Sequence, residues 1–228
     1  PLMGLLSKKD TKETKDFESE FYFPTSEQTV LIFTRNPELG KVKTRLAAGV
    51  GDEAALAIYK FLLEHTVSIT KDLSADKQVF YSEKIRSEDL WDESNYIKKL
   101  QYGFDLGARM HKAFEDSFKA GYKKVIIIGS DIYDLSQKDI DLAFSELDHH
   151  DFIVGPAQDG GYYLLGMTFL LPQLFQNKEW GTETVLEDTL KDLRSHSFKL
   201  LEVRNDVDYY EDIKGIDAFI PFLPNHLK

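Results

Sequence analysis

The sequence of 228 residues contains no cysteine. This absence excludes disulfide bonds, zinc sites built from thiolates, and catalysis by a thiol nucleophile. The sequence also lacks an apolar run of about 18 residues, the length that marks a transmembrane helix. We therefore expect a cytoplasmic protein without a membrane span.

Positive charge is scarce. The chain has 28 Lys and Arg residues against 39 Asp and Glu residues, a formal net charge of -11. A protein that binds nucleic acid usually needs a broad basic face, so this balance argues against a nucleic-acid partner. Familiar catalytic patterns are missing too, because the sequence has neither a serine nucleophile elbow nor a Walker A loop.

The hydrophobic pattern predicts strands alternating with helices. Expected strands cover 29–34, 78–82, 96–102, 123–131, 152–155, 162–167 and 199–204. Expected helices begin at an Asp52 N-cap, at Leu106 (ending at Gly121), at Ser136 or Lys138, at Glu183, and near the C-terminus. Such alternation predicts an α/β fold, a mainly parallel mixed sheet with helices on both faces in three layers. We expect a flexible tail over residues 1–20 and a single domain over residues 21–228.

A basic loop follows the first expected strand. Its four cations are Arg35, Lys41, Lys43 and Arg45. In an otherwise acidic protein, a local basic patch favours a small anionic ligand. The loop leads into a helix start near Thr44, where free N–H groups would favour a phosphate. The alternative is a solvated loop whose cations pair with surface acids.

Acidic residues stand at the ends of other expected strands, where parallel sheets bind ligands. Asp131 follows the most apolar strand and is placed to hold a divalent metal; a turn or capping aspartate is the alternative. Asp159 precedes two glycines, which allow close approach of a ligand but also suit an ordinary Asp-Gly turn. Asp206 and Asp208 alternate at strand spacing, so we expect one of them at most to face the site.

The order of PELGKVKTRL, DLGARM, GSDIYDL, GPAQDGGYYLLG, WGTETVL and DVDYYED resembles the GT-A-like nucleotide-diphospho-sugar transferase superfamily, with its Rossmann-like three-layer fold. Within it, the chain is most similar to a bacterial glycosyltransferase-like family related to 2-phospho-L-lactate guanylyltransferase and the molybdenum cofactor nucleotidyltransferases. The resemblance covers about residues 29–213.

The resemblance implies roles for individual residues. Lys43, Arg45 and Asp131 would be catalytic, and Asp131 and Asp208 would bind Mg²⁺ or Mn²⁺. Nucleotide or substrate binding would involve Arg35, Gly40, Lys41, Lys43, Arg45, Arg109, Asp159, Gly160 and Gly161, with metal binding as the alternative role of Asp159.

The implied function is metal-dependent nucleotidyl transfer from an NTP to a small acceptor, which can itself be phosphorylated, with release of pyrophosphate. The basic loop favours this reaction because its cations suit a pyrophosphate leaving group. Two alternatives stay open: a glycosyltransferase that uses a nucleoside diphosphate-sugar, and a non-catalytic nucleotide-binding protein. The partners expected are therefore a nucleotide and a small-molecule acceptor, with the oligomeric state undetermined.

Overall fold

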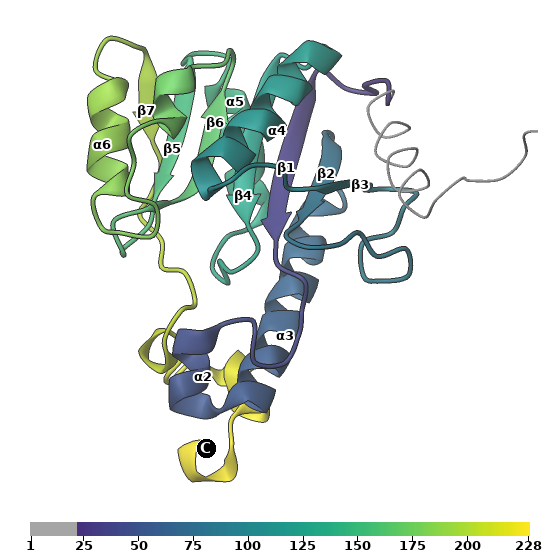
Figure 1. Cartoon of the computed structure of the whole chain (residues 1–228), viewed down its shortest axis with the longest axis vertical. Helices are drawn as coiled ribbons and strands as arrows, with labels where there is room; N and C mark the ends of the chain where they lie inside the picture. The colour runs from purple at the N-terminus through teal and green to yellow at the C-terminus, as the bar shows by residue number, and fades with distance from the viewer. Residues whose placement is uncertain (1–21) are drawn as a thin grey trace, which may run out of the picture.

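The computed structural model describes residues 22–228, and the expected tail over residues 1–20 lies outside them. One seven-stranded sheet runs through the molecule in the order β3-β2-β1-β4-β6-β5-β7 (Figure 1). The strands are β1 Gln28–Thr34, β2 Asp76–Tyr81, β3 Ile97–Leu100, β4 Lys124–Gly129, β5 Phe152–Pro156, β6 Tyr162–Met167 and β7 Phe198–Leu200. Within residues 22–228, only β6 pairs antiparallel with its neighbours, so the prediction of a mainly parallel mixed sheet is confirmed.

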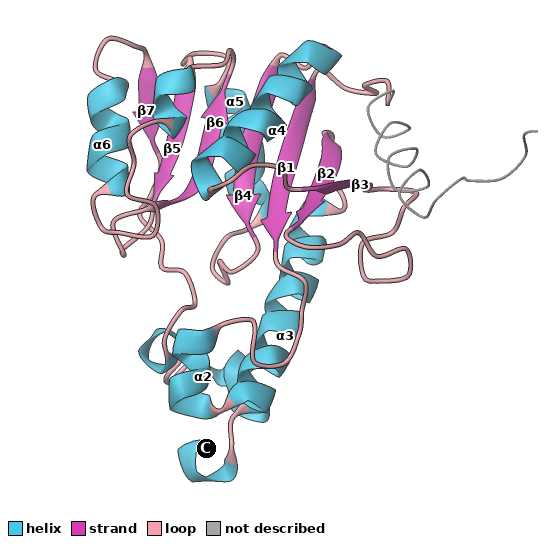
Figure 2. Ribbon diagram, in the orientation of Figure 1, coloured by secondary structure: helices cyan, strands magenta, loops and turns pink. Residues whose placement is uncertain are grey.

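Helices cover both faces of this sheet (Figure 2). The α-helices are α2 Thr44–Val50, α3 Asp52–Thr70, α4 Leu106–Ala120, α5 Gln137–Glu146 and α6 Val185–Asp192, and η1 Pro172–Phe175 is a 3-10 helix. Side chains of α3 and α5 pack on one face in a cluster that includes Tyr59, Leu63, Ile140 and the strand residue Ile128. Side chains of α4, η1 and α6 pack on the other face against strand residues such as Ile127. The predicted three-layer arrangement is therefore present.

Burial on both faces explains why the central strands could be recognised from the sequence. Val30, Leu31 and Ile32 of β1 have no exposed side-chain surface, because one face of the strand meets each helical layer. Strands buried on both faces are continuous apolar runs instead of alternating ones.

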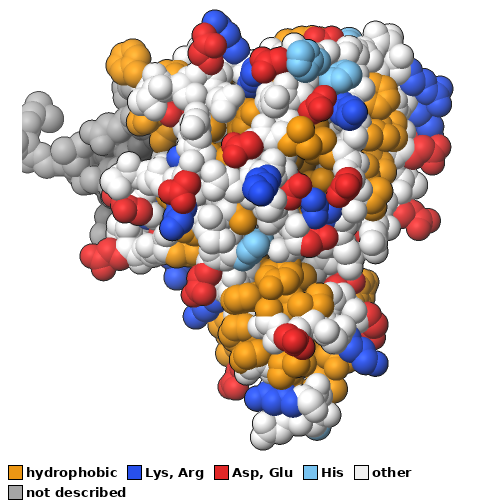
Figure 3. Space-filling view, turned by 180° about the vertical axis from the view of Figure 1, so that it is seen from behind, with side chains coloured by type: hydrophobic (Ala, Val, Ile, Leu, Met, Phe, Trp, Pro, Cys, Tyr) orange, Lys and Arg blue, Asp and Glu red, His pale blue; other side chains and the backbone are white. Residues whose placement is uncertain are grey.

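A lobe extends below the carboxyl ends of the strands (Figure 1). It consists of α2, the first half of α3 and three C-terminal 3-10 turns, η2 Tyr210–Asp212, η3 Asp217–Phe222 and η4 Asn225–Leu227. A third apolar cluster holds these elements together through Leu46, Ile58, Ile213 and Phe219. Seen from behind, the surface of this lobe carries many apolar side chains (Figure 3). The lobe fixes α2, and hence the basic loop, against the C-terminal segment.

Several element boundaries differ from the prediction. The predicted C-terminal helix is wrong: Gly215 has a φ of +80° and Pro221 lies inside η3, so the chain forms 3-10 turns. The late strand is also shorter than predicted, because only 198–200 pair with β5, and Arg204 adds one isolated bridge to Ala157.

Two helix starts were predicted inaccurately. Gly51, with a φ of 89°, is the N-cap of α3, and Asp52 is its first residue. The helix expected from Glu183 begins at Val185 instead, after a turn in which Thr182 N–H bonds to Glu179 O. Among the described residues, no helix combines the length and the apolarity that crossing a bilayer would require.

Candidate functional site

The candidate site lies where the basic loop meets the carboxyl end of β4. Lys43 Nζ donates a hydrogen bond of 2.8 Å to Asp131 Oδ2, although the two residues are 88 positions apart in the chain. The Lys43 side chain is only 8% exposed, whereas that of Asp131 is 34% exposed. A buried ammonium therefore reaches a carboxylate that is still open to solvent.

The backbone of Lys43 is in an unusual conformation. Its φ of 50° and ψ of 45° are left-handed, and it is the residue directly before α2. Lysine rarely adopts this conformation, which costs about 1–2 kcal/mol for residues other than glycine. Such strain at a polar cluster is typical of functional sites, where surrounding contacts hold a side chain in place.

Acidic neighbours keep the Lys43 ammonium charged. Burial by itself lowers its pKa, but the carboxylates of Asp131, Asp208 and Asp206 outweigh burial, and the pKa of Lys43 is raised overall. Three carboxylates from two separate segments thus act on one ammonium group.

Arg45 forms a second pair at the same site. Arg45 Nη1 donates to Asp208 Oδ2 at 2.7 Å, and the guanidinium carbon lies 5.7 Å from the centre of the Tyr209 ring. The Arg45 side chain is 58% exposed, so this pair contributes little to stability. The Arg45 guanidinium, beside the Asp208 carboxylate, is instead accessible to a ligand.

Asp206 also belongs to the site. Burial, followed by repulsion from the carboxylates of Asp131 and Asp159, raises the pKa of Asp206 to about 6. The alternation rule misassigned this residue because 205–208 are irregular and not a strand. Both aspartates of the DVD segment therefore act on the same cluster. The only sequence signal was the pair of aspartates itself.

Hydrogen bonds fix the segments that carry these side chains. The Tyr59 hydroxyl lies 3.1 Å from Thr34 Oγ1 and 3.2 Å from Ser130 Oγ, which ties the ends of β1 and β4 to α3. Val207 N–H donates to Asp131 O at 3.0 Å.

Arg204 joins the same two segments. Its Nη1 donates to Asp134 O at 2.7 Å, and its Nη2 lies 2.8 Å from Asp139 Oδ1. The loop after β4 and the segment 204–208 are consequently held together as one unit.

The Asp159 turn forms another wall of the site. Asp159 Oδ1 accepts a hydrogen bond of 2.9 Å from Gly161 N–H, the turn contact expected for the Asp-Gly alternative. Gly160 has a φ of +88°, and a Cβ there would lie 2.3 Å from Glu183 O. Glycine is required at this position by the close approach of the 182–184 turn. The Asp159 charge also acts on Arg45 and Asp206, so the turn contact does not remove it from the site.

A cavity of about 230 Å³ opens beside these carboxylates. Its walls come from the ends of β1 and β4, the start of α4 and the turn before α6, and include Phe33, Leu106, Met110, Ile127, Gly129, Asp159, Gly161, Tyr162 and Trp180. Asp131 Oδ1 is 3.0 Å from where a Gly129 Cβ would lie, which places this carboxylate at the edge of the cavity.

Other predicted site residues are placed farther from this cluster or have other contacts. Lys41 pairs with Glu38 at 2.6 Å in an exposed loop, as the solvated-loop alternative anticipates for this one cation. Arg35 is exposed, and its backbone N–H donates to the Tyr59 hydroxyl. Gly40 turns the loop with a φ of +72°. Arg109 bonds to Gly103 O at 3.1 Å and to Gln101 Oε1 at 3.3 Å, so it braces the loop before α4.

The predicted helix-start phosphate site is weaker than expected. Helix α2 has only seven residues and no side-chain cap. A helix of two turns offers little dipole, so any phosphate binding here depends on the side chains of Lys43 and Arg45.

Over residues 22–228, no group of three or more acidic or histidine side chains is arranged closely enough to enclose a metal ion. Mg²⁺ commonly takes only one or two carboxylates from a protein and completes its shell with phosphate oxygens and water. The cluster has such carboxylates, and burial together with the negative charges of Asp131 and Asp159 raises the pKa of Asp206. The donor set fits a hard divalent cation shared with a phosphate ligand.

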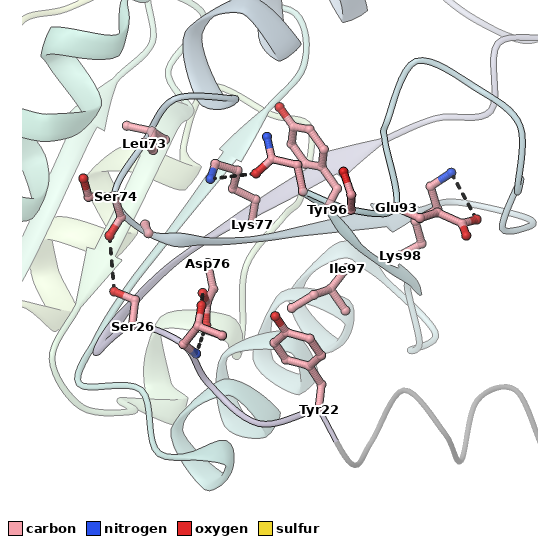
Figure 4. A pocket seen from close by; sticks show the side chains of 14 residues that line it. Tyr22, Ser26, Leu73, Ser74, Asp76, Lys77, Glu93, Tyr96, Ile97 and Lys98 are labelled. Atoms are coloured by element: carbon pink, nitrogen blue, oxygen red, sulfur yellow. Dashed lines mark hydrogen bonds and ion pairs between the residues drawn. The ribbon is translucent and has the colours of Figure 1, made fainter.

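A larger cavity of about 550 Å³ lies at the amino ends of β2 and β3, away from these carboxylates (Figure 4). Its polar side chains are largely used within the fold: Asp76 accepts from Thr25 N–H at 2.8 Å and from the Tyr122 hydroxyl at 2.6 Å, and Lys77 Nζ donates to Asn95 Oδ1 at 3.2 Å. Tyr22, the first described residue, stands on its rim. Size alone does not make it the functional site, because ligands of parallel sheets bind beyond the carboxyl ends of the strands.

Comparison with known proteins places the chain in a family. Residues 66–182, more than half of the chain, match the family model described as "Uncharacterized protein conserved in bacteria (DUF2064)". The chain belongs to this family. Among curated proteins, none matches.

Solved structures show the same fold. A protein from Desulfovibrio desulfuricans G20, described as a "putative nucleotide-diphospho-sugar transferase", is 33% identical, with a TM-score of 0.76 over 85% of this chain and 90% of that one. A 4-diphosphocytidyl-2C-methyl-D-erythritol synthase from Anaerococcus prevotii is 9% identical, with a TM-score of 0.55 over 86% and 97% of the two chains. A cytidylyltransferase from Leptospira borgpetersenii is 14% identical, with a TM-score of 0.50 over 89% and 90%. The fold is therefore that of the nucleotide-diphospho-sugar transferases and nucleotidyltransferases, and the predicted superfamily is confirmed.

Proposed function

We propose that the protein is a metal-dependent transferase that uses a nucleotide as donor, and that it transfers a nucleotidyl group from an NTP with release of pyrophosphate. The observation that carries this proposal is the buried Lys43 ammonium, held by a left-handed backbone at 2.8 Å from Asp131 and next to the Arg45–Asp208 pair. Two cations and two carboxylates in one cluster suit a polyphosphate and its metal ion.

The protein's own groups would act by position and charge. Phosphoryl and nucleotidyl transfers need the reacting phosphorus held in line and the charge of the leaving group neutralised. Lys43 is already ordered by burial and Arg45 is accessible, so both can exchange a carboxylate oxygen for a phosphate oxygen. Asp131 and Asp208, released from these ion pairs, would hold Mg²⁺. When bound, the metal would supply further charge neutralisation on the phosphate oxygens.

A second candidate is transfer of a sugar from a nucleoside diphosphate-sugar. It is supported by the 33% identical protein from Desulfovibrio desulfuricans, whose description names such a transferase. The same carboxylates would then hold the metal against a diphosphate that leaves from an anomeric carbon.

One assay separates the two candidates. The protein is incubated with each NTP, and separately with each of a set of nucleotide sugars, in the presence of Mg²⁺ and a mixture of hydroxyl and phosphate acceptors. Release of pyrophosphate from an NTP supports nucleotidyl transfer. Release of nucleoside diphosphate from a nucleotide sugar, without pyrophosphate from any NTP, would replace the proposal by the second candidate. Failure to consume either class of donor would contradict both.

A further inference from the structure

The cavity beside Asp131 and Asp159 has a composition that bears on the acceptor. In the described part of the chain, its lining contains aromatic and aliphatic side chains but neither lysine nor arginine. Asp159 is the charged residue among those that line it, and the Asp131 carboxylate, which is paired with Lys43, stands at its edge. Burying an anionic group in such a cavity without a cationic partner would be costly.

The cavity and the basic loop reach the carboxylates from opposite faces of the sheet. Lys43 and Arg45 are carried by the segment that leads into α3, which packs on the face of Tyr59 and Ile128. The cavity lies mainly on the other face, between Met110 of α4 and Ile127 of β4, and reaches Ile128 and Tyr163 at the end of the sheet. In-line transfer places the nucleophile and the leaving group on opposite sides of the reacting atom. If the cations hold the leaving phosphates, the nucleophile arrives from the cavity.

Specific contacts shape the cavity for a ring. The Trp180 indole packs directly over Gly107, where a Cβ would lie 2.6 Å from ring atoms, so only glycine lets the indole take this position. The Tyr162 hydroxyl contacts Met110 Sδ at 3.7 Å, a weak acceptor, and keeps hydrogen-bonding capacity for a ligand. The volume of the cavity is below the range of about 300–1,000 Å³ that is typical of sites for drug-sized ligands. The ligand is therefore limited to about one ring.

We propose that this cavity binds the acceptor, and that the acceptor is an uncharged hydroxyl compound with a flat or apolar ring face, not a phosphorylated one. This assignment rests on the proposed function, and it replaces the phosphorylated acceptor that the sequence left open. In the reaction, the acceptor oxygen bonds to the α-phosphorus as the bond to pyrophosphate breaks, and pyrophosphate leaves with the electron pair. The hydroxyl proton passes to the Asp159 carboxylate at the rim and then to water.

Binding can be measured without any donor, because Trp180 reports on the cavity. The chain has two tryptophans, and Trp91 is only 1% exposed in a different cluster. Benzyl alcohol and benzyl phosphate are titrated against the protein in EDTA, and fluorescence is followed. We expect a saturable change with benzyl alcohol, loss of that change in Trp180→Phe, and binding of benzyl phosphate at least about tenfold weaker. Equal or tighter binding of benzyl phosphate, tighter binding of cytidine or guanosine, or no response to any probe would overturn the proposal.

A charge-introducing variant tests the same point in reverse. Leu106 lines the cavity and is 44% exposed, so Leu106→Lys places a cation at its mouth without disturbing the core. We expect this variant to bind benzyl phosphate about tenfold more tightly than the wild type does. Leu142→Lys, at a 51% exposed position of α5, is the matched control and should leave both affinities unchanged. An equal gain in both variants would contradict a specific cavity effect.

Turnover separates this inference from the proposed function. A donor that is consumed with ring-bearing alcohols but not with their phosphates supports both. Consumption only with phosphorylated acceptors overturns the inference and leaves the function standing. If benzyl alcohol binds at Trp180 as expected but no NTP or nucleotide sugar is consumed with any acceptor, the proposed function fails, and the acceptor role with it.

Discussion

Lys43 and Asp131 meet at 2.8 Å across 88 residues of sequence, and Lys43 does so from a left-handed backbone conformation. A structural ion pair would not require strain at the lysine, because a surface cation can reach a carboxylate from many backbone positions. The buried stem and the fixed backbone leave the ammonium few alternative positions. We interpret Lys43 as a phosphate-binding residue and Asp131 as a metal-binding residue, which pair with each other when no nucleotide is bound.

Replacing Lys43 with asparagine separates function from stability. Asparagine tolerates the left-handed conformation better than lysine does, which offsets part of the cost of leaving Asp131 without its partner, so Lys43→Asn should lower the free energy of unfolding by no more than about 2 kcal/mol. Loss of the charge should slow turnover about 10² to 10³-fold. Chemical denaturation and the donor assay give the two values. Lys41→Asn, in the exposed pair with Glu38, is the control and should alter neither. A large loss of stability with little loss of turnover would make Lys43 a structural residue.

The raised pKa of Asp206 predicts a pH-dependent gain in stability on neutralisation. In the folded protein this carboxyl titrates at about 6 against an ordinary value of 3.8, so its ionisation destabilises the fold as pH rises through that interval. Asp206→Asn should therefore raise the free energy of unfolding at pH 7.5 by about 1–2 kcal/mol, a figure reduced for partial exposure, and have little effect at pH 3.5. Denaturation at the two pH values measures the difference.

Because Asp159 is one of the charges that raise this pKa, the gain should be smaller when Asp206→Asn is made in an Asp159→Asn background. The same gain at both pH values would show that ionisation of Asp206 is not its source.

Two glycines offer a matched test of the turn that carries Asp159. Gly160 and Gly181 have φ values of +88° and +83°, but only at Gly160 would a Cβ meet backbone atoms, at 2.3 Å; at Gly181 it would meet nothing within 4 Å. Gly181→Ala should lose about 1 kcal/mol of stability from backbone strain alone. Gly160→Ala should lose more than about 2 kcal/mol, because the 182–184 turn must move. Thermal unfolding compares them, and equal losses would contradict the close approach.

Arg204 should matter for stability although it binds no substrate in this account. Its side chain is 14% exposed and joins Asp134 of the loop after β4 and Asp139 of α5 to the segment carrying Asp206 and Asp208. Arg204→Met should destabilise by about 2–3 kcal/mol, because carboxylate and carbonyl groups lose a partly buried partner. Lys191→Met removes a 47% exposed cation paired with Glu187 and should cost less than about 0.5 kcal/mol. Urea denaturation of the two variants decides, and similar losses would argue against this role of Arg204.

The sequence predicted the elements whose pattern is local and strong. β1 and β4 are buried on both faces, and α4 has a single apolar face with Gly121 at its C-cap, so each appears close to its expected place. It failed where tertiary contacts decide: the segment 205–208 is irregular because Val207 N–H bonds to Asp131 O, which alternation along a strand cannot anticipate. Asp206 was consequently excluded from the site.

The sequence likewise could not predict that Lys43 pairs with Asp131 and Arg45 with Asp208. The resemblance implied a role for each residue separately. No local pattern indicates that the cations of the basic loop pair with the carboxylates expected to hold a metal. The lobe cluster that fixes α2 against the C-terminal segment, with Leu46 and Ile213, decides this geometry.

The central claim is that Lys43, Arg45, Asp131 and Asp208 form one site for a nucleotide phosphate and its metal ion. Isothermal titration of nucleoside triphosphates and diphosphates, with and without Mg²⁺, into the wild type, Lys43→Asn and Arg45→Gln tests it most directly. We predict binding of at least one nucleotide that strengthens with Mg²⁺, weakens with salt, and falls at least about tenfold in both variants. Nucleotide binding of equal affinity in all three proteins, or no binding of any nucleotide to the wild type, would contradict the account.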